Sequence, residues 1–162
     1  MAGVGQRTLD WRWRVNGRLL LALALSLTAS AAGAQKNPDQ MEWGPPPEGL
    51  PPGALLSVLS GDPAKAGLFT IRLRFPPGYK VMPHHHPSDE LVTVIAGELS
   101  LGMGDRFRDK KATSLVRGGY AVAPANMNHF AFTKDGATVQ ITANGPFAIT
   151  YVNPRDDPRR KK

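Results

Sequence analysis

Apolar and polar residues alternate along much of the chain after residue 53. In the segment 69–75, apolar residues occupy every second position, and threonine and arginine occupy the positions between them. This period of two predicts a strand with one buried face, because successive side chains of an extended chain point to opposite sides. Runs of the same kind, rich in β-branched and aromatic residues, predict further strands in the segments 54–60, 91–96, 98–103, 119–123, 128–132, 138–143 and 148–151.

Turn-forming residues, mainly glycine, proline and asparagine, separate these short segments. Many short strands joined by such turns are typical of a double-sheet roll or barrel. The sequence contains no internal repeat and no helical period long enough for an α/β crossover, and the one helical feature expected is a single turn within 105–111. The pattern therefore predicts an all-β, single-domain jelly-roll barrel over residues 54–153.

The first 34 residues have the pattern of a secretory signal peptide. Four arginines precede or flank the apolar run Leu19–Leu27, and the small residues Ala32, Gly33 and Ala34 offer a cleavage site before Gln35. The apolar run is shorter than the roughly 20 residues that span a bilayer, so it does not favour a permanent anchor. We therefore expect cleavage after Ala34, no stable membrane insertion after processing, and a periplasmic or secreted protein.

Two further segments flank the predicted barrel. Residues 35–53 contain six prolines and three glycines, which disfavour both helix and central strand, so they are expected to form an extended arm along the surface or toward a partner subunit. Residues 154–162 end in four basic residues and are expected to form a disordered, solvated tail.

The net charge of +7 is located mostly outside the predicted barrel. Residues 1–34 carry +3 and the last four residues carry +4, which leaves the body neutral. A nucleic-acid-binding protein instead needs basic residues on its folded surface, so no nucleic-acid partner is expected. The chain has no cysteine, which excludes disulfides, thiolate ligands and thiol nucleophiles.

The candidate chemistry lies in two segments that contain all four histidines. In an extended strand, His84 and His86 project to the same side, and His85 projects to the opposite side. Glu90 follows at the start of the next predicted strand, and His129 lies in a later one. Imidazole and carboxylate groups are ligands that divalent transition metals prefer, so these side chains predict a metal site.

The same residues carry a resemblance to the cupin superfamily. Its first motif spaces a glycine, a His-x-His pair, a glutamate and a second glycine, and every fixed position is matched here by Gly78, His84, His86, Glu90 and Gly97. Its second motif is matched by Gly118, Pro124 and His129, with two departures: Asn126 replaces the middle glycine and Thr133 replaces the final asparagine. Asparagine tolerates a positive φ well, whereas the loss of the final asparagine is expected to alter a local hydrogen bond.

The resemblance implies a cupin-like double-stranded β-helix that is a homodimer. It also implies that one divalent transition metal, which is manganese, iron, nickel, copper or zinc, is held by four ligands: His84, His86, Glu90 and His129. A small-molecule metalloenzyme with redox or oxygen-dependent chemistry then follows as the first hypothesis. A non-catalytic module that uses the metal to hold a small ligand or to stabilise the barrel is the second, and a metal-free structural or partner-binding domain is the third.

Other side chains near the motifs are expected to play lesser parts. Glu98 and Gln140 are candidates to orient a ligand imidazole, although the alternation leaves their direction open. A set of aromatic residues and methionines could form either pocket walls or plain core: Tyr79, Met82, Met103, Met127, Phe130, Phe147 and Tyr151.

Overall fold

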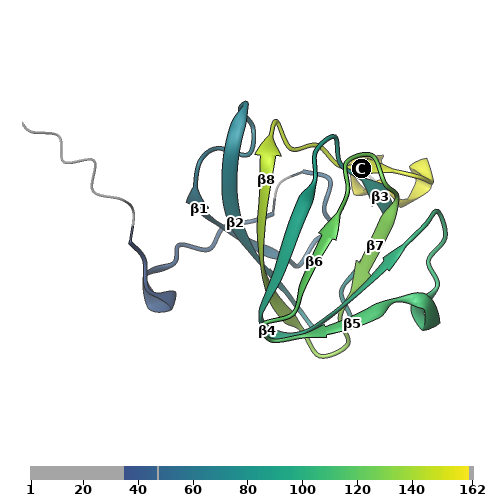
Figure 1. Cartoon of the computed structure of the whole chain (residues 1–162), viewed down its shortest axis with the longest axis horizontal. Helices are drawn as coiled ribbons and strands as arrows, with labels where there is room; N and C mark the ends of the chain where they lie inside the picture. Colours follow the sequence, from purple (N-terminus) through teal and green to yellow (C-terminus); the bar gives the residue numbers. More distant parts are fainter. Residues whose placement is uncertain (1–34, 47, 161–162) are drawn as a thin grey trace, which may run out of the picture. The chain divides into compact units, whose positions relative to one another are not determined.

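The computed structural model describes residues 35–46 and 48–160, and the predicted signal peptide lies outside the described residues. The described part is all-β, as the alternation predicts, and its only helical elements are short 3₁₀ turns (Figure 1). Its strands are β1 (Leu55–Ser60), β2 (Gly67–Phe75), β3 (Lys80–His85), β4 (Glu90–Met103), β5 (Thr113–Val116), β6 (Tyr120–Ala123), β7 (His129–Phe132), β8 (Ala137–Gly145) and β9 (Thr150–Tyr151). The 3₁₀ turns are η1 (Pro38–Gln40), η2 (Asp109–Lys111), η3 (Pro154–Asp156) and η4 (Pro158–Arg160). Within the described ranges, no helix is long and apolar enough to cross a membrane.

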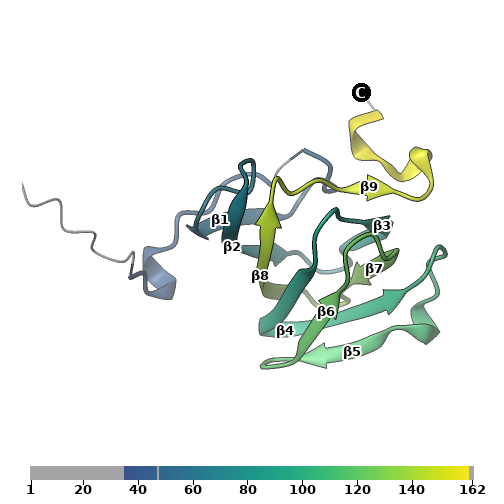
Figure 2. The same ribbon diagram turned by 45° about the horizontal axis from the view of Figure 1, so that its top comes forward.

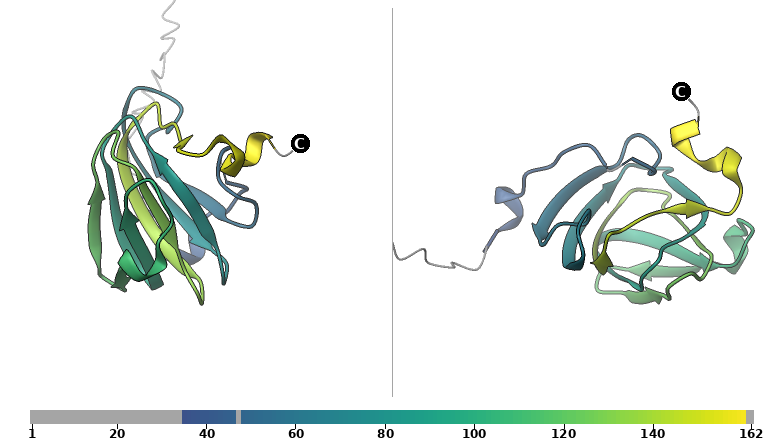
Figure 3. Two further views of the ribbon diagram at one scale, coloured as in Figure 1. Left: turned by 90° about the vertical axis from the view of Figure 1, so that its right-hand side faces the viewer. Right: turned by 90° about the horizontal axis from the view of Figure 1, so that it is seen from above.

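The strands form one antiparallel sheet that curls on itself, in the order β1-β2-β8-β4-β7-β3-β9. Strands β5 and β6 pair with β4 beside this path. Figure 2 shows β9 crossing near β3, and the view from above in Figure 3 shows the strands arranged around a common interior. The predicted all-β, cupin-like fold is therefore confirmed.

Strand β4 is a single long strand where the alternation predicts two strands flanking Gly97. The half before Gly97 pairs with β6 and β8, and the half after it pairs with β5 and β7. Gly97 has a φ of 73°, and a Cβ at this position would lie 2.2 Å from the carbonyl oxygen of Gly136. Glycine is required at this position both for the left-handed conformation and for the close approach of two backbones.

The core is built from alternate residues, as the period of two predicts. On β2, Phe69, Ile71 and Leu73 are at most 4% exposed, and on the paired strand β8 Val139 and Ile141 are equally buried. Arg72, between two of the core residues, instead donates a hydrogen bond to the side chain of Gln140 on β8. Burial of apolar surface at about 25 cal/mol per Å² is the main force that holds these strands together.

The alternation does not predict two of the strands. Strand β3 contains Pro83 and a run of histidines, and it has a register shift between Val81 and His84 in its pairing with β7. Strand β5 is short and mostly exposed. Strand β5 has no buried residue, and the buried residues of β3 are Val81, Pro83 and His84, which do not form a regular apolar alternation. Both strands therefore depend on pairing with neighbours that are distant in sequence. The single helical turn expected within 105–111 is present as η2.

The arm lies against the barrel. The backbones of Gly44 and Leu56 exchange two hydrogen bonds of 2.8 and 2.9 Å. The Arg74 guanidinium lies 4.2 Å from the centre of the Trp43 ring, which places a cation over an aromatic face. Further along the arm, Tyr151 donates a 2.7 Å hydrogen bond to the carbonyl of Gly49. These contacts join residues 43–49 to β1, β2 and β9.

The C-terminal segment differs from the predicted disordered tail. Residues 154–160 form η3 and η4, and the guanidinium of Arg159 pairs with the carboxylate of Asp157 at 2.8 Å. Arg159 also donates a hydrogen bond to the carbonyl of Ile149, just before β9. The expectation of disorder rested on the basic composition, which does not reveal that one of the basic side chains has an acidic partner two residues away.

Candidate metal centre

Four buried polar side chains meet inside the curled sheet. His84 lies near the end of β3, His86 follows that strand, Glu90 begins β4, and His129 begins β7. His84 and His129 are directly opposite each other in the β3–β7 pairing. Their exposed fractions are 4% for His84 and His86, 7% for Glu90 and 1% for His129. Polar groups are rarely so buried without a partner, so this cluster requires an explanation.

The three imidazoles are in mutual contact. Their ring centroids are 4.3 Å apart for His84 and His129, 4.9 Å for His84 and His86, and 5.2 Å for His86 and His129. One nitrogen of each ring, the one that could bind a metal, lies within 4.8 Å of the corresponding nitrogens of the other two rings. This buried three-histidine cluster could hold a metal ion. Glu90 lies outside that group of three but contacts it: its Oε2 is 3.3 Å from Nε2 of His129 and 3.7 Å from Nε2 of His86.

Backbone carbonyls determine which nitrogen of each ring carries the proton. The Nδ1 atoms of His84, His86 and His129 lie 2.7, 2.8 and 2.9 Å from the carbonyl oxygens of Met82, Ala148 and Met127, in that order. A carbonyl oxygen only accepts hydrogen bonds, so each Nδ1 must donate. The lone pair of each neutral ring is then on Nε2, which is the nitrogen left for a metal.

The remaining nitrogens suit a cation. The Nε2 atoms of His86 and His129 are fully buried; that of His86 has no hydrogen-bond partner among the described residues, and that of His129 has only its ion-pair contact with Glu90. Buried polar atoms without partners are rare in folded proteins, and each one destabilises the fold by about 1–3 kcal/mol. A divalent cation would occupy these lone pairs and neutralise the nearby carboxylate, so the donor set fits a metal ion.

Burial keeps two of the imidazoles neutral. Burial is the main cause, and charge repulsion from His129 and His86 the next, of a pKa for His84 that is lowered from 6.5 to about 3. Burial also lowers the pKa of His86, although Glu90 and the Ala148 carbonyl oppose this effect. Both rings therefore present a lone pair at neutral pH, which is the state that binds a metal.

Glu90 and His129 form an ion pair in the metal-free protein. Burial alone would raise the pKa of Glu90, but the adjacent His129 and His86 outweigh it and hold that pKa below its usual value. Burial likewise would lower the pKa of His129, but the Glu90 carboxylate outweighs it and raises that pKa. A metal at this site must therefore displace a proton from His129.

His85 faces away from the cluster, as the pleat of the strand predicts. Its Nδ1 lies 2.9 Å from the side-chain oxygen of Asn128, and the Asn128 amide donates a 2.7 Å hydrogen bond to Asp105. This chain of polar contacts lies at the rim of the barrel. A substitution of His85 is therefore the control for substitutions of the three inward imidazoles.

The groups that orient the imidazoles are not the ones considered from the sequence. Gln140 accepts a hydrogen bond from Arg72 on the outer face of the sheet, and Glu98 is exposed on β4. The backbone carbonyls of Met82, Ala148 and Met127 orient the imidazoles instead. Every residue has a backbone carbonyl, so the sequence contains no signal for these three.

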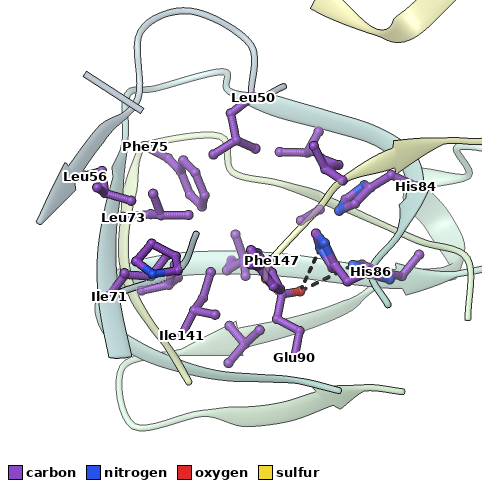
Figure 4. A pocket seen from close by; sticks show the side chains of 18 of the residues that line it. Leu50, Leu56, Ile71, Leu73, Phe75, His84, His86, Glu90, Ile141 and Phe147 are labelled. Atoms are coloured by element: carbon purple, nitrogen blue, oxygen red, sulfur yellow. Dashed lines mark ion pairs between the residues drawn. The ribbon is translucent and has the colours of Figure 1, made fainter. Parts of the chain in front are cut away.

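The cluster forms one end of a cavity of about 200 Å³. Most of the lining is aliphatic or aromatic, and Figure 4 shows Leu56, Leu73 and Phe75 on the side away from His84 and His86. In Figure 4, dashed lines join the Glu90 carboxylate to two of the imidazoles, and these are its contacts with His86 and His129. The cavity thus has a polar end made by the candidate ligands and an apolar end made by the barrel core.

Of the aromatic residues and methionines considered as walls, Phe147 lines the cavity. Its ring is stacked on His86, with centroids 4.2 Å apart and an interplanar angle of 19°. Tyr79 and Tyr151 are buried and bond the arm, while Met103 and Met127 are about half exposed. The arm adds lining residues that the sequence pattern did not suggest, Glu48 and Leu50.

The two departures in the second motif have local structural roles. Asn126 has a φ of 60° and is the one non-glycine residue with positive φ in the described part of the chain, so it serves where the motif has glycine. Its N–H donates a 2.8 Å hydrogen bond to the carbonyl of His86. The hydroxyl of Thr133 accepts a 3.0 Å hydrogen bond from the N–H of Gly136, which closes the turn before β8.

Comparison with known proteins agrees with this architecture. A family model described as the ChrR cupin-like domain matches residues 32–148. No protein of curated function matches the chain.

Several solved structures have the same fold. The polyketide cyclase RemF from Streptomyces resistomycificus superposes with a TM-score of 0.64 at 16% identity, over 76% of this chain and 88% of that one. An RmlC-like cupin from Shewanella frigidimarina gives 0.53 at 19% identity, over 67% and 87%. KdgF from a Halomonas species gives 0.52 at 20% identity, over 67% and 91%. At these identities the similarity concerns the fold alone.

Proposed function

This chain belongs to the family of ChrR cupin-like domains, and from this premise we propose that it is a small-molecule metalloenzyme. One divalent transition metal is held by four side chains: His84, His86, Glu90 and His129. Three of them form the buried cluster, and the fourth supplies the negative charge beside it. We assign the enzymatic function to this site because the four side chains form the polar end of the cavity.

The observation that carries the proposal is the orientation of the imidazoles. Each Nδ1 is bonded to a backbone carbonyl, the Nε2 of His86 has no hydrogen-bond partner among the described residues, and the Nε2 of His129 faces only the Glu90 carboxylate. A histidine buried only for packing would satisfy both nitrogens. Three rings aligned in this way resemble metal ligands whose outer nitrogens are held in place by the protein.

The donor set limits the metal. Three nitrogens and one oxygen without sulfur are compatible with manganese, iron, nickel, copper or zinc. Selection among these metals depends on supply in the compartment as much as on affinity. When bound, such a metal supplies Lewis-acid or one-electron redox chemistry. We favour oxidoreductase chemistry, because the resemblance to oxygen-dependent cupins rests on this three-histidine, one-glutamate set.

The chain's own residues prepare the site for that chemistry. Glu90 places a carboxylate next to the imidazoles and offsets part of a cation's charge. Phe147 and the aliphatic lining exclude water from the polar end of the cavity, which strengthens the electrostatic interactions there. The carbonyls of Met82, Ala148 and Met127 hold the rings so that little reorganisation accompanies binding.

The decisive experiment joins metal analysis to oxygen uptake. Protein recovered from its own compartment is analysed for bound metal, and oxygen consumption is then followed with phenolic, flavonoid and dicarboxylic compounds. We expect close to one equivalent of a redox-active metal, and turnover that is lost in His84→Ala. Less than about a tenth of an equivalent after reconstitution would contradict the proposal and favour a metal-free structural domain.

A non-catalytic metal-dependent binding module is the second candidate. It is favoured by the cavity lining, where Glu48 is the one ionisable residue outside the four candidate ligands over residues 35–46 and 48–160. A reaction that needs a separate general acid or base therefore has few groups to use. In this case His84→Ala would lower ligand affinity or the melting temperature in a protein that has no turnover to lose.

We also propose that the mature chain is exported and is a homodimer. The charged and apolar pattern of residues 1–34 supports export, and the resemblance to cupins supports the dimer. Cell fractionation with N-terminal sequencing checks the first statement, with Gln35 as the expected first residue. Analytical ultracentrifugation checks the second, and a monomer across the micromolar range would contradict it.

A further inference from the structure

The cavity next to the histidine cluster is small and strongly polarised from end to end. Its volume is about 200 Å³, its apolar end lies against β2 and β8, and its polar atoms are concentrated at the candidate ligands. We propose that it selects a monocyclic, largely apolar molecule that carries one oxygen donor, such as a phenolate, an enolate or a carboxylate. This inference rests on the proposed function, because the donor group is expected to face the metal.

The volume limits the size of the ligand. An apolar protein cavity of about 150 Å³ accommodates benzene. The present cavity is somewhat larger, so it has room for one ring and a small substituent, and it is too small for two fused rings. The walls do not yield easily: Phe147 is held by stacking on His86 and by an edge contact with Phe69, whose ring centroid lies 5.2 Å away.

The distribution of polar atoms limits the ligand's chemistry. Outside the candidate ligands, Glu48 is the one lining residue with a hydrogen-bonding side chain in the part of the chain that the structure describes. A sugar would bring several hydroxyl groups into this space, and most of them would be buried without partners. A ring with its donor at one end instead matches the arrangement in Figure 4, where His84 and His86 lie opposite Leu56 and Leu73.

The charges of the lining argue against a dicarboxylate. Among the described residues that line the cavity, none is a lysine or an arginine. A cation at the histidine cluster would neutralise one carboxylate of a molecule whose two carboxylates lie far apart, and the second would face aliphatic side chains such as Ile71 and Ile141. Burial of an unpaired charge is strongly unfavourable, so one anionic group is the limit for a ligand of this cavity.

A series of carboxylates tests the size and the polarity separately. Zinc-loaded protein is titrated with acetate, benzoate, 2-naphthoate and terephthalate by isothermal calorimetry, and the same titrations are made on metal-free protein. Acetate has the donor without the ring, terephthalate has a second charge at the far side of the ring, and naphthoate has a second ring. We expect benzoate to bind at least about tenfold more tightly than each of the other three, because it alone fills the apolar end without excess volume or charge.

Two substitutions in the lining give the proposal a second readout. Leu73→Ala enlarges the apolar end and is expected to shift the preference from benzoate toward 2-naphthoate. Val139→Phe fills the same end and is expected to abolish the advantage of benzoate over acetate. Leu68→Ala is the matched control, since Leu68 precedes the core positions of β2, is 66% exposed and does not line the cavity. Zinc content is measured for each variant, so that a loss of folding is recognised as such.

The outcomes separate this inference from the proposed function. Failure of the protein to take up zinc overturns the proposed function. Zinc uptake with terephthalate or acetate binding as tightly as benzoate overturns the ligand class and leaves the metal site standing. Benzoate binding that is equally tight without zinc overturns the role given to the metal but supports the size of the ligand. A benzoate preference that requires zinc and changes in Leu73→Ala supports both.

Discussion

The carboxylate of Glu90 lies 3.3 Å from Nε2 of His129, although the two residues begin different strands of the curled sheet. The proximity raises the pKa of His129 against the effect of burial and lowers that of Glu90. His129 in the metal-free site therefore keeps its proton to a higher pH than an ordinary imidazole does. A cation that takes the Nε2 lone pair must displace that proton.

Replacement of Glu90 by glutamine is expected to reduce this proton release. At pH 6, below the raised pKa of His129, the wild-type protein should release a proton from His129 when it binds zinc, whereas His84, with a pKa of about 3, has none to release. Glu90→Gln should release clearly less, and zinc affinity should fall at least about tenfold. Calorimetry in buffers of different ionisation enthalpy measures the proton count. Glu98→Gln, an exposed position on the same strand, should behave as wild type, and equal proton release in both variants would contradict the pairing.

His84→Ala and His85→Ala are neighbouring substitutions with opposite expected effects. His84 points into the cluster, whereas His85 contacts Asn128 at the rim. We expect His84→Ala to lower the bound metal to a small fraction of an equivalent, because one of three mutually close nitrogens is lost. His85→Ala should retain full metal content. Elemental analysis of both purified variants checks the pair, and a similar loss in each would mean that the strand is not oriented as described.

The stability of the metal-free protein should fall in acid because His84 resists protonation. Its pKa is about 3 in the folded state and 6.5 when unfolded, so the unfolded chain takes up a proton first. Above pH 6.5 the ring is neutral in both the folded and the unfolded chain, so its titration does not change the free energy of unfolding. As the pH falls from 6.5 toward 3, that free energy decreases, by roughly 2 kcal/mol at pH 5. His86 acts in the same direction, and the raised pKa of His129 acts in the opposite one.

Urea unfolding of the metal-free protein at pH 7.5 and pH 5 measures this effect. In His84→Gln the loss of stability between these two pH values should be smaller than in the wild type, because the variant has no imidazole to protonate when it unfolds. His85→Gln is the matched control and should keep the wild-type difference. Identical pH dependence in the wild type and in His84→Gln would show that His84 ionises as freely in the folded protein as in the unfolded chain.

Two glycines with the same backbone conformation should respond differently to alanine. Gly97 and Gly78 have φ values of 73° and 75°, but an added Cβ would meet the Gly136 carbonyl at the first and open space at the second. Gly78→Ala is expected to cost about 1–2 kcal/mol, the strain of a left-handed alanine. Gly97→Ala should cost about 1–3 kcal/mol more, because two strands must separate. Chemical denaturation of both variants gives the difference, and equal values would exclude the close approach.

The hydroxyl of Tyr151 should hold the arm over the cavity. It donates a 2.7 Å hydrogen bond to the carbonyl of Gly49, next to the lining residues Glu48 and Leu50. Tyr151→Phe is expected to reduce stability by about 1 kcal/mol and to speed hydrogen exchange of the arm amides, since one anchor is removed. Tyr120→Phe, at an exposed position, is the control. Unchanged exchange in the arm would show that the other contacts hold it without this hydroxyl.

The sequence by itself determined the class of the fold and the direction of the key side chains. A period of two along residues 69–75 reveals a half-buried strand, because the pleat alternates side chains whatever the strand packs against. The same rule sends His84 and His86 inward and His85 outward. The turn residue Asn126 is likewise legible, because a positive φ restricts the residue types at a single position.

Only the tertiary structure decided how the site is completed. Three contacts have no signal in the side-chain pattern. They are the bond of His86 Nδ1 to the carbonyl of Ala148, the 3.3 Å contact of Glu90 with His129, and the bond of Arg159 to the carbonyl of Ile149. The physical reason is that local geometry depends on neighbouring residues, whereas carbonyl partners, pKa shifts and the shape of the cavity depend on which distant strands the curled sheet brings together.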